Sequence, residues 1–322
     1  MHRAVDTAIW HGRDDAAPGT ERWHQKVIPL TPELIDAGAP GFVLLGICSD
    51  AGVRRNLGRR GAGKGPDAIR AALANQAWHL AGPCYDAGNL LCVDDDLEAI
   101  QKEQAAWLER LLDLGHLPLV LGGGHEIALG SYLGLRQHLQ RQGQRGVIGI
   151  INFDAHFDLR KAGMANSGTP FLQIADSCTE QNLPFRYFCL GVSEVANTAA
   201  LFETAASVGA HWLLDEELTS WNLPQAERQL REFVASCDFI QLSIDLDVLP
   251  ASVAPGVSAP APRGVSLEIV EHLLNFMKAQ AGKKLKVVEI AECNPEFDID
   301  ARTAKVAARL CHILARKDKV SD

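Results

Sequence analysis

The chain has 322 residues, of which 47% are hydrophobic and 22% charged, and its formal net charge is −9 at pH 7. That length allows a sizeable core, while acidic and basic residues mixed along a net negative chain argue against an electrostatic nucleic-acid binder. No apolar run reaches the roughly 18 residues of a membrane-spanning helix, and the first residues lack the apolar core of a signal peptide, so we expect no membrane partner.

The chain divides into a polar first stretch and a long stretch in which two kinds of segment alternate. Residues 1–40 are polar and irregular, which predicts an N-terminal surface arm, and residues 41–322 show no linker, which predicts one domain. Apolar segments of strand length lie at 42–47, 117–121, 147–153, 187–190, 211–214, 239–244 and 285–290. Segments of helical spacing lie at 66–78, 97–114, 127–140, 197–207, 224–235, 267–279 and 298–315, with Pro66 and Pro224 near helix starts and Asn197 and Asp298 as possible N-caps.

These elements predict an α/β fold. Continuous apolar strands that alternate with amphipathic helices are typical of a mainly parallel sheet covered by helices on both faces. In such sheets ligands bind beyond the carboxyl ends of the strands. We therefore expect a single three-layer α/β/α domain with its site at that edge.

His and Asp residues gather where three of the expected strands end. His125 follows strand 117–121, an Asp-x-His-x-Asp stretch follows strand 147–153, and two Asp residues end strand 239–244. Because side chains alternate along an extended chain, we expect each group to point one way. Buried carboxylates are costly unless positive charge compensates them, and oxygen ligands with two imidazoles suit a pair of ions such as Mn²⁺ or Mg²⁺. The predicted ligands are His125, Asp154, His156, Asp158, Asp245 and Asp247. The alternative for any one of them is a capping Asp or a satisfied core His.

Two glycine-rich segments invite a phosphate-binding interpretation. The run 122–124 precedes an expected helix, but His125 follows at once, so we interpret the glycines as a tight turn that lets His125 enter the site. Segment 58–64 has the spacing of a P-loop, yet Gly65 and Pro66 stand where a Ser or Thr should bind magnesium, and no expected strand directly precedes it. We therefore exclude nucleotide binding there.

Eight cysteines are scattered through the chain without a CxxC spacing. In a chain of this length the pattern predicts reduced, mostly buried thiols and a cytoplasmic protein. It also argues against a zinc site built from thiolates.

The motifs resemble the arginase/ureohydrolase superfamily over residues 41–315. GGGHE, DAHFD, SIDLD and, downstream, ECNP occur in the order and spacing of that superfamily. Stretches such as SDAGVRRN, GPDAIR and APGVSAP resemble its formimidoylglutamase group more narrowly. The resemblance implies an arginase-like catalytic domain with about eight mainly parallel strands, and a homo-oligomer.

The resemblance also implies roles for the site residues. One ion would be bound by His125, Asp154, Asp158 and Asp245, and the other by Asp154, His156, Asp245 and Asp247, so that two Mn²⁺ ions share two bridging carboxylates. A water activated between the ions would attack the substrate, and Asp158 would carry the proton. Glu292 would bind the amidine-like nitrogens; its alternative is a charge at a loop or helix start.

One position after the DAHFD motif separates this chain from arginases. Ser167 lies nine residues after Asp158 and Phe171 four residues further on, and we expect both to bind the substrate. In arginases the second position holds a His credited with proton transfer, whereas an aromatic ring stands here. This difference argues against arginase activity and agrees with a substrate whose central carbon bears hydrogen rather than a third nitrogen. The alternative is that Phe171 merely packs on the sheet.

Basic and polar residues near these motifs are candidates for binding the substrate. Arg160 lies two residues after Asp158, where a guanidinium could hold a carboxylate with two hydrogen bonds. Arg54 and Arg55 could take a second carboxylate, or they could form a solvated basic turn. Asn197 follows a strand on the same rim and could line the pocket.

Through the resemblance, these residues predict a binuclear metal hydrolase that converts N-formimidoyl-L-glutamate and water to L-glutamate and formamide in histidine degradation. One alternative is another ureohydrolase that acts on arginine or a guanidino acid, although the arginines argue against the cationic substrate agmatine. An alternative of a different class is a non-catalytic metal-binding regulatory subunit. The complete ligand set and Glu292 argue against it.

Overall fold

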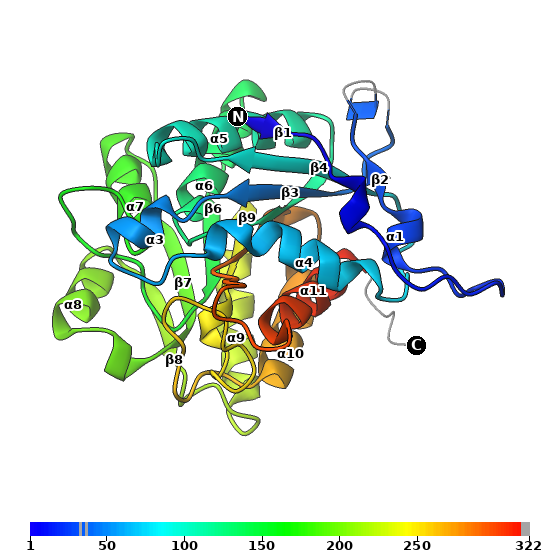
Figure 1. Ribbon diagram of the computed structural model, residues 1–322. Helices are drawn as coiled ribbons and strands as arrows, with labels where there is room; N and C mark the ends of the chain where they lie inside the picture. The colour runs from blue at the N-terminus through cyan, green and yellow to red at the C-terminus, as the bar shows by residue number, and fades with distance from the viewer. Residues whose placement is uncertain (32–33, 36–37, 317–322) are drawn as a thin grey trace.

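The structure is a computed structural model that describes residues 1–31, 34–35 and 38–316. Its strands form one sheet in the order β1-β4-β3-β5-β10-β9-β6-β7-β8, with β2 alongside β4 (Figure 1). Every pairing is parallel except that of β1 with β4. The predicted mainly parallel α/β/α fold is therefore confirmed, with ten strands among the described residues rather than about eight.

The strands are β1 His2–Arg3, β2 Ile28–Pro29, β3 Phe42–Cys48, β4 Cys84–Leu91, β5 Leu117–Leu121, β6 Ile148–Phe153, β7 Arg186–Val192, β8 His211–Leu214, β9 Phe239–Asp245 and β10 Leu285–Ala291. The helices are α1 Trp23–Lys26, α3 Ala51–Arg55, α4 Gly65–Ala74, α5 Leu97–Asp113, α6 Ile127–Arg141, α7 Pro170–Glu180, α8 Ala199–Ser207, α9 Leu223–Ala235, α10 Leu267–Ala281 and α11 Arg302–Ala315. Short 3-10 turns include η2 Ala62–Lys64, η3 Glu194–Ala196 and η4 Leu246–Val248.

Two hydrophobic cores lie on the two faces of the sheet. One contains residues of α5, α6 and α7, and the other contains residues of α4, α9, α10 and α11. Successive residues of β6 serve both, because Ile150 belongs to the first core and Ile151 to the second. The continuous apolar strands of the sequence thus reflect burial on both faces of the sheet.

All seven expected strands and all seven expected helices are present, with ends that differ by a few residues. The largest differences are in α4, which ends at Ala74, and in α11, which begins at Arg302. Asp298 is not the N-cap residue of α11, which is Ala301, but its carboxylate accepts from the backbone N–H groups of Thr303 at 2.9 Å and Ala304 at 3.1 Å in the first turn. Asn197 lies before α8, whose N-cap position is Thr198.

Strand β4 was missed because polar residues interrupt its apolar pattern. Asp86 and Asn89 are buried in it, and the buried guanidinium of Arg70 compensates both. Arg70 donates to the two Asp86 carboxylate oxygens at 2.9 and 2.8 Å and to Asn89 Oδ1 at 2.6 Å. A buried ion pair from a helix therefore replaces the apolar side chains that periodicity looks for.

The first forty residues, expected as a surface arm, contact the sheet in the described part of that stretch. β1 and β2 both pair with β4. Trp23 in α1 is fully buried, lies edge-on to Trp78, and donates from Nε1 to His312 Nδ1 at 3.3 Å. Among the described residues, no helix is both long and apolar enough to cross a membrane.

Four neighbouring central strands carry the candidate site at their carboxyl ends. In sheet order these are β5, β10, β9 and β6. They lead to His125, to Glu292, to Asp245 and to Asp154, respectively. Because Phe153 is in register with Ile244 and Ala291 with Asp245, the groups begin at the same level of the sheet. The fold therefore brings together residues that are far apart in the chain.

Candidate metal centre and substrate cavity

The first group of candidate ligands surrounds the imidazole of His125. Its Nδ1 atom lies 3.1 Å from Asp154 Oδ2, 2.9 Å from Asp158 Oδ2 and 3.2 Å from Asp245 Oδ2. This nitrogen is buried and has no hydrogen-bond partner. One imidazole nitrogen facing three carboxylates is an arrangement that a cation between them would satisfy.

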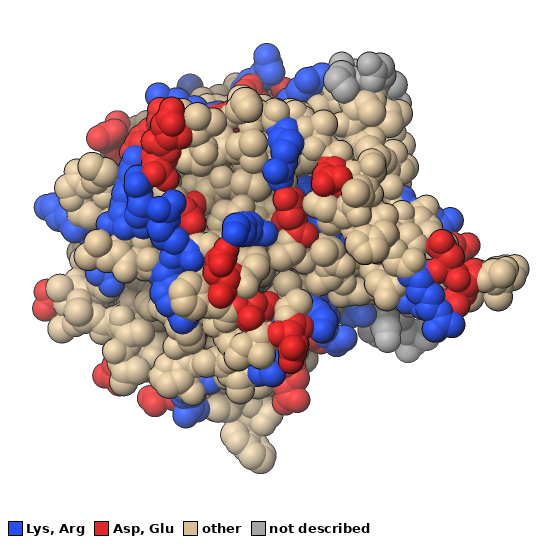
Figure 2. Space-filling view, in the orientation of Figure 1, with Lys and Arg blue, Asp and Glu red and all other residues tan. Residues whose placement is uncertain are grey.

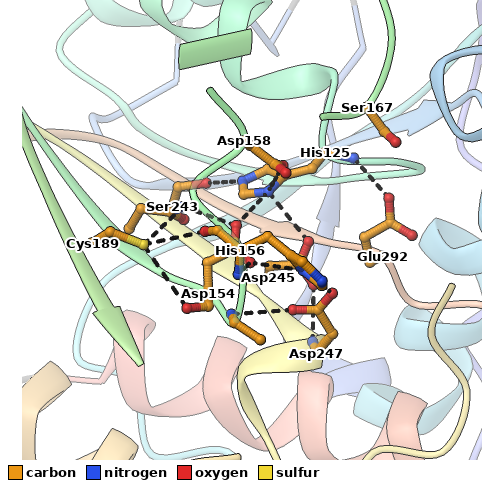
Figure 3. A network of polar contacts seen from close by, with 12 residues as sticks. His125, Asp154, His156, Asp158, Ser167, Cys189, Ser243, Asp245, Asp247 and Glu292 are labelled. Atoms are coloured by element: carbon orange, nitrogen blue, oxygen red, sulfur yellow. Dashed lines mark hydrogen bonds and ion pairs between the residues drawn. The ribbon is translucent and has the colours of Figure 1, made fainter. Parts of the chain in front are cut away.

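The second group shares Asp154 with the first. His156 Nδ1 lies 3.0 Å from Asp247 Oδ2 and 3.5 Å from Asp154 Oδ1. The ligand atoms of each group lie within 4.8 Å of one another. Asp245 belongs to the first group alone, whereas the resemblance implied that it bridges both. Figure 3 shows the six side chains turned toward one another.

Loop geometry, rather than strand alternation, aims these ligands. Strand β6 ends at Phe153, so Asp154, His156 and Asp158 all follow it, and Asp158 has a left-handed backbone with φ 47°. Asp247 lies in the 3-10 turn η4, where its N–H donates to Asp245 Oδ1 at 2.9 Å. The groups converge as expected, but the expected physical reason was wrong for these residues.

Close packing explains the glycine run 122–124. A Cβ at Gly123 would lie 1.6 Å from the carbonyl oxygen of Ser49, and one at Gly124 would lie 2.0 Å from Glu126 Oε2. These glycines do not have positive φ, so space rather than a special turn requires them. The loop that carries His125 can then lie directly against the loop after β3.

The site carries more negative charge than its two imidazoles balance. Burial, reinforced by Asp247 and Asp154, raises the pKa of Asp245 well above its ordinary value. Burial also raises the pKa of Glu292 well above its ordinary value. For His125, burial alone would lower the pKa, but the facing carboxylates hold the pKa well above its usual range. A bound cation would stabilise these carboxylates in their ionised form, and it would take the place of the proton on His125 Nδ1.

Buried polar residues support the ligands from behind. Ser243 Oγ lies 2.8 Å from His125 Nε2, which leaves Nδ1 to face the carboxylates. Asn197 accepts from the N–H of Phe157 at 3.2 Å and donates to the carbonyl of Ala155 at 2.9 Å. Asn197 is therefore a brace for the loop after β6. It does not line the substrate cavity as we expected.

A cavity of about 320 Å³ opens beside both groups. Metal-site carboxylates and Glu292 line this cavity together with two guanidinium groups. The lining residues are Asn56, Leu57, Gly58, Arg59, His156, Asp158, Arg160, Ser167, Asp245, Asp247, Ser258, Ala259 and Glu292.

Glu292 stands between the ligands and the cavity. Its carboxylate accepts from the backbone N–H of His125 at 3.1 Å through Oε1, while Oε2 is buried without a hydrogen-bond partner. Its backbone is left-handed, with φ 67°. A buried carboxylate oxygen without a partner, on a residue with a strained backbone, is suited to accept a hydrogen bond from an N–H group of the substrate.

The cavity includes two of the expected substrate-binding residues. Ser167 Oγ accepts from Asn56 Nδ2 at 3.1 Å, so the Ser167 hydroxyl is tied to the loop after β3. Arg160 is exposed and lines the cavity, and its side chain packs against Gly168. A Cβ at Gly168 would lie 2.9 Å from Arg160 Cδ. Gly168 is thus needed for the path of this side chain.

The other expected substrate-binding residues lie elsewhere. Arg54 pairs with Asp95 at 2.7 Å, and Arg55 pairs with Glu98 at 2.7 Å, so neither lines the cavity. Phe171 is fully buried behind His125, edge-on at 5.3 Å between ring centroids, and stacks on Tyr187. Phe171 is therefore a packing residue, which was the alternative to a role in substrate binding. Its ring supports the His125 imidazole and does not line the cavity.

The cavity is also lined by residues that we did not predict from the sequence. Arg59 belongs to the P-loop-like segment that we set aside, and Asn56 precedes it in the same loop. No local pattern distinguished them. For Ser243, the alternation within β9 was an available signal, since it places Ser243 on the same face as Asp245.

Comparison with known proteins gives one consistent result. The sequence model described as the arginase family matches residues 40–315. A formimidoylglutamase from Aeromonas hydrophila is 53% identical over 97% of this chain and 98% of its own length. A formimidoylglutamase from Chromobacterium violaceum is 51% identical over 97% of this chain and 98% of its own length.

Solved structures share the fold. Formimidoylglutamase from Bacillus subtilis has a TM-score of 0.79 with 22% identity and covers 94% of each chain. Trypanosoma cruzi formiminoglutamase with Mn²⁺ has a TM-score of 0.74 with 24% identity, covering 87% of this chain and 94% of its own. The family match over residues 40–315 and the relatives at about half identity establish the relationship: the chain belongs to the arginase family.

Proposed function

We propose that this chain hydrolyses N-formimidoyl-L-glutamate to L-glutamate and formamide. The observation that carries the proposal is one cavity lined both by Glu292 and ligand carboxylates and by the guanidinium groups of Arg59 and Arg160. The substrate carries the same groups: an amidine that would face the acidic residues, an α-carboxylate next to it and a γ-carboxylate two methylene groups further on. Relatives named formimidoylglutamase at about half identity over almost the whole chain support the same substrate.

We further propose that two Mn²⁺ ions are the cofactor. The donor set fits hard divalent ions, because it consists of carboxylate oxygens and two imidazole nitrogens and includes no thiolate. His125, Asp154, Asp158 and Asp245 would hold one ion, and Asp154, His156 and Asp247 the other. When bound, the pair lowers the pKa of water and polarises the substrate.

The side chains then bind, orient and move protons. Glu292 Oε2 accepts from the amidine nitrogens and so turns the formimidoyl carbon toward the ligand groups. Asp158 lines the cavity and is less completely buried than Asp154 and Asp245. Because Asp158 lies in the cavity beside both ligand groups, its free carboxylate oxygen could take a proton and deliver it to the departing glutamate nitrogen. Arg160 would hold a substrate carboxylate with paired N–H donors.

We also propose a cytoplasmic homo-oligomer. All eight cysteines are free thiols, and six of them are buried, which supports a reducing compartment. The family resemblance supports the oligomer. Sedimentation of the purified chain would test it.

Steady-state turnover by the Mn²⁺-loaded protein tests the function. We expect formamide release from N-formimidoyl-L-glutamate and at most about a hundredth of that kcat/KM with L-arginine, agmatine or guanidinobutyrate, because each guanidino group differs from the amidine that the site fits. Release of urea as the faster reaction would favour a guanidino hydrolase. Two bound ions without turnover of any of these compounds would favour the regulatory subunit.

Arg160→Ala should raise KM for N-formimidoyl-L-glutamate by about 10- to 100-fold and leave kcat within about threefold. The reason is that a charge-assisted contact to a remote carboxylate contributes equally to the ground state and the transition state. Initial rates over a range of substrate concentrations measure both constants. Lys161→Ala, an exposed neighbour outside the cavity lining, is the matched control. An unchanged KM in Arg160→Ala would remove this residue from carboxylate binding.

A further inference from the structure

We infer that Arg59 is the second guanidinium that recognises a substrate carboxylate, in place of Arg54 and Arg55. The inference deepens the proposed function and rests on it. It makes the substrate class a dicarboxylic amidino acid, held by two arginines that line the same cavity as the ligand groups. The cavity contains these two guanidinium groups among the residues the structure describes, and Arg59 and Arg160 supply them.

Protein contacts hold the Arg59 guanidinium on one edge and one face. Nε donates to the carbonyl of Ser258 at 3.0 Å, and Nη2 donates to the carbonyl of Val257 at 2.6 Å. The ring of Phe297 covers one face, with its centroid 4.5 Å from Cζ. The protein contacts thus use Nε and Nη2 and leave the Nη1 edge for a ligand. A guanidinium fixed in advance loses little conformational freedom on binding a carboxylate.

The backbone around Arg59 is fixed as firmly as its side chain. The N–H of Arg59 donates to Ser258 Oγ at 3.0 Å, and its carbonyl accepts from Asn294 Nδ2 at 2.9 Å. Gly58 allows this approach, since a Cβ there would lie 2.4 Å from Ser258 Oγ. Asn294 is fully buried and lies two residues after Glu292. The same segment therefore positions the amidine-binding carboxylate and Arg59.

The neighbouring arginines are already paired with carboxylates. Arg54 and Arg55 pair with Asp95 and Glu98, and Arg60 lies 3.4 Å from Asp50. Figure 2 shows Lys and Arg side chains gathered with acidic ones over the region that α3 and the loop after it occupy in Figure 1. Arg59 differs from these arginines because its protein partners are neutral carbonyls, so its charge is uncompensated by an ion pair.

Charges of both signs in the cavity specify how the substrate lies. Asp158, Asp245, Asp247 and Glu292 are the acidic lining residues, toward which a cationic amidine turns. The carboxylates of the same molecule then face Arg59 and Arg160. A guanidino substrate with a cationic tail would instead place like charges together, which costs affinity for the wrong compound.

The test is a comparison of substrates that differ by one charge. kcat/KM is measured for the wild-type chain and for Arg59→Gln with N-formimidoyl-L-glutamate and with its two monoamides, N-formimidoyl-L-glutamine and N-formimidoyl-L-isoglutamine. Arg59→Gln should lower kcat/KM for the dicarboxylate by about 10- to 100-fold. With the monoamide that lacks the carboxylate bound by Arg59, the same substitution should change kcat/KM by less than about threefold. Arg60→Gln is the control and should stay within about threefold throughout.

These measurements decide whether Arg59 binds a substrate carboxylate. An equal loss on all three substrates, or no loss on the dicarboxylate, would overturn the assignment and leave Arg59 a brace between loops. Arg59→Lys, which keeps the charge without the fork, should show a smaller loss in the same pattern. It replaces Arg59→Gln if that variant does not fold. A wild-type chain with two ions and no turnover of N-formimidoyl-L-glutamate would overturn the proposed function, and this inference with it.

Discussion

Asp154→Asn should lower kcat for N-formimidoyl-L-glutamate by about a thousand-fold or more and reduce the metal content below two ions per chain. Asp154 is the one carboxylate common to both ligand groups, with oxygens 3.1 Å from His125 Nδ1 and 3.5 Å from His156 Nδ1. An amide has one oxygen and no charge, so it cannot serve both groups. Loss of metal-based transition-state stabilisation of several kcal/mol corresponds to about this factor. Metal analysis and steady-state rates measure the two effects.

The stability of the Asp154→Asn variant separates a lost ligand from a damaged fold. Mn²⁺ should raise the melting temperature of the wild-type chain, since a ligand at 100 times its dissociation constant stabilises by about 2.7 kcal/mol per site. Mn²⁺ should raise the melting temperature of the Asp154→Asn variant much less. Without metal, the substitution has two opposing effects on stability. It removes one of several buried negative charges, which is favourable, but it places an NH₂ group beside the N–H of His156 or the amide of Asn152, both of which donate to Asp154, which is unfavourable. We therefore expect a small change in the metal-free protein.

Asp176→Asn is the matched control, because Asp176 is exposed on α7 and belongs to neither ligand group, and the substitution removes the same charge. It should keep metal, melting temperature and rate. An Asp154→Asn protein with two ions and wild-type kcat would show that the two groups are not a metal centre.

Much of the fold was predictable because its strands are buried on both faces. Apolar runs such as β5 and β9 are visible without any partner, and their alternation with helices determines a parallel sheet. Strand β4 was not visible, because its apolar pattern is broken by Asp86 and Asn89. Their compensation comes from Arg70, on a helix earlier in the chain. Local periodicity does not report a pairing of that kind.

The ligands were predictable for a similar reason, and the substrate wall was not. His and Asp residues at strand ends must converge in a parallel sheet, whatever the loops do in detail. The cavity wall is formed instead by loops brought together over long separations. Arg59 and Ser258 are 199 residues apart, and their contact decides whether that arginine faces the substrate. A neighbouring arginine such as Arg55 has the same local sequence character but ends in a salt bridge with Glu98.

Glu292→Gln should lower kcat/KM for N-formimidoyl-L-glutamate by about 100- to 1,000-fold while the chain keeps two ions. Glutamine has the same shape, and its oxygen can still accept from the N–H of His125, as Glu292 Oε1 does at 3.1 Å. The NH₂ group then takes the place of Oε2, the buried oxygen without a partner. It would face the donor N–H groups of the amidine. Replacing a buried charged contact by an unmatched group costs about 3–5 kcal/mol, which is at least this factor.

Metal content and the choice of control distinguish this role from a structural one. The ligand groups do not include Glu292, so metal analysis should find the same two ions in Glu292→Gln as in the wild-type chain. Glu296→Gln changes an exposed glutamate that pairs with Lys64 and lies outside the substrate cavity, so it should remain within about threefold of wild-type kcat/KM. If Glu292→Gln kept wild-type kcat/KM, the amidine would have to be bound elsewhere. If it lost metal in proportion to rate, Glu292 would support the centre rather than the substrate. Loss of rate with both ions retained would leave Glu292 Oε2 as the atom that orients the amidine.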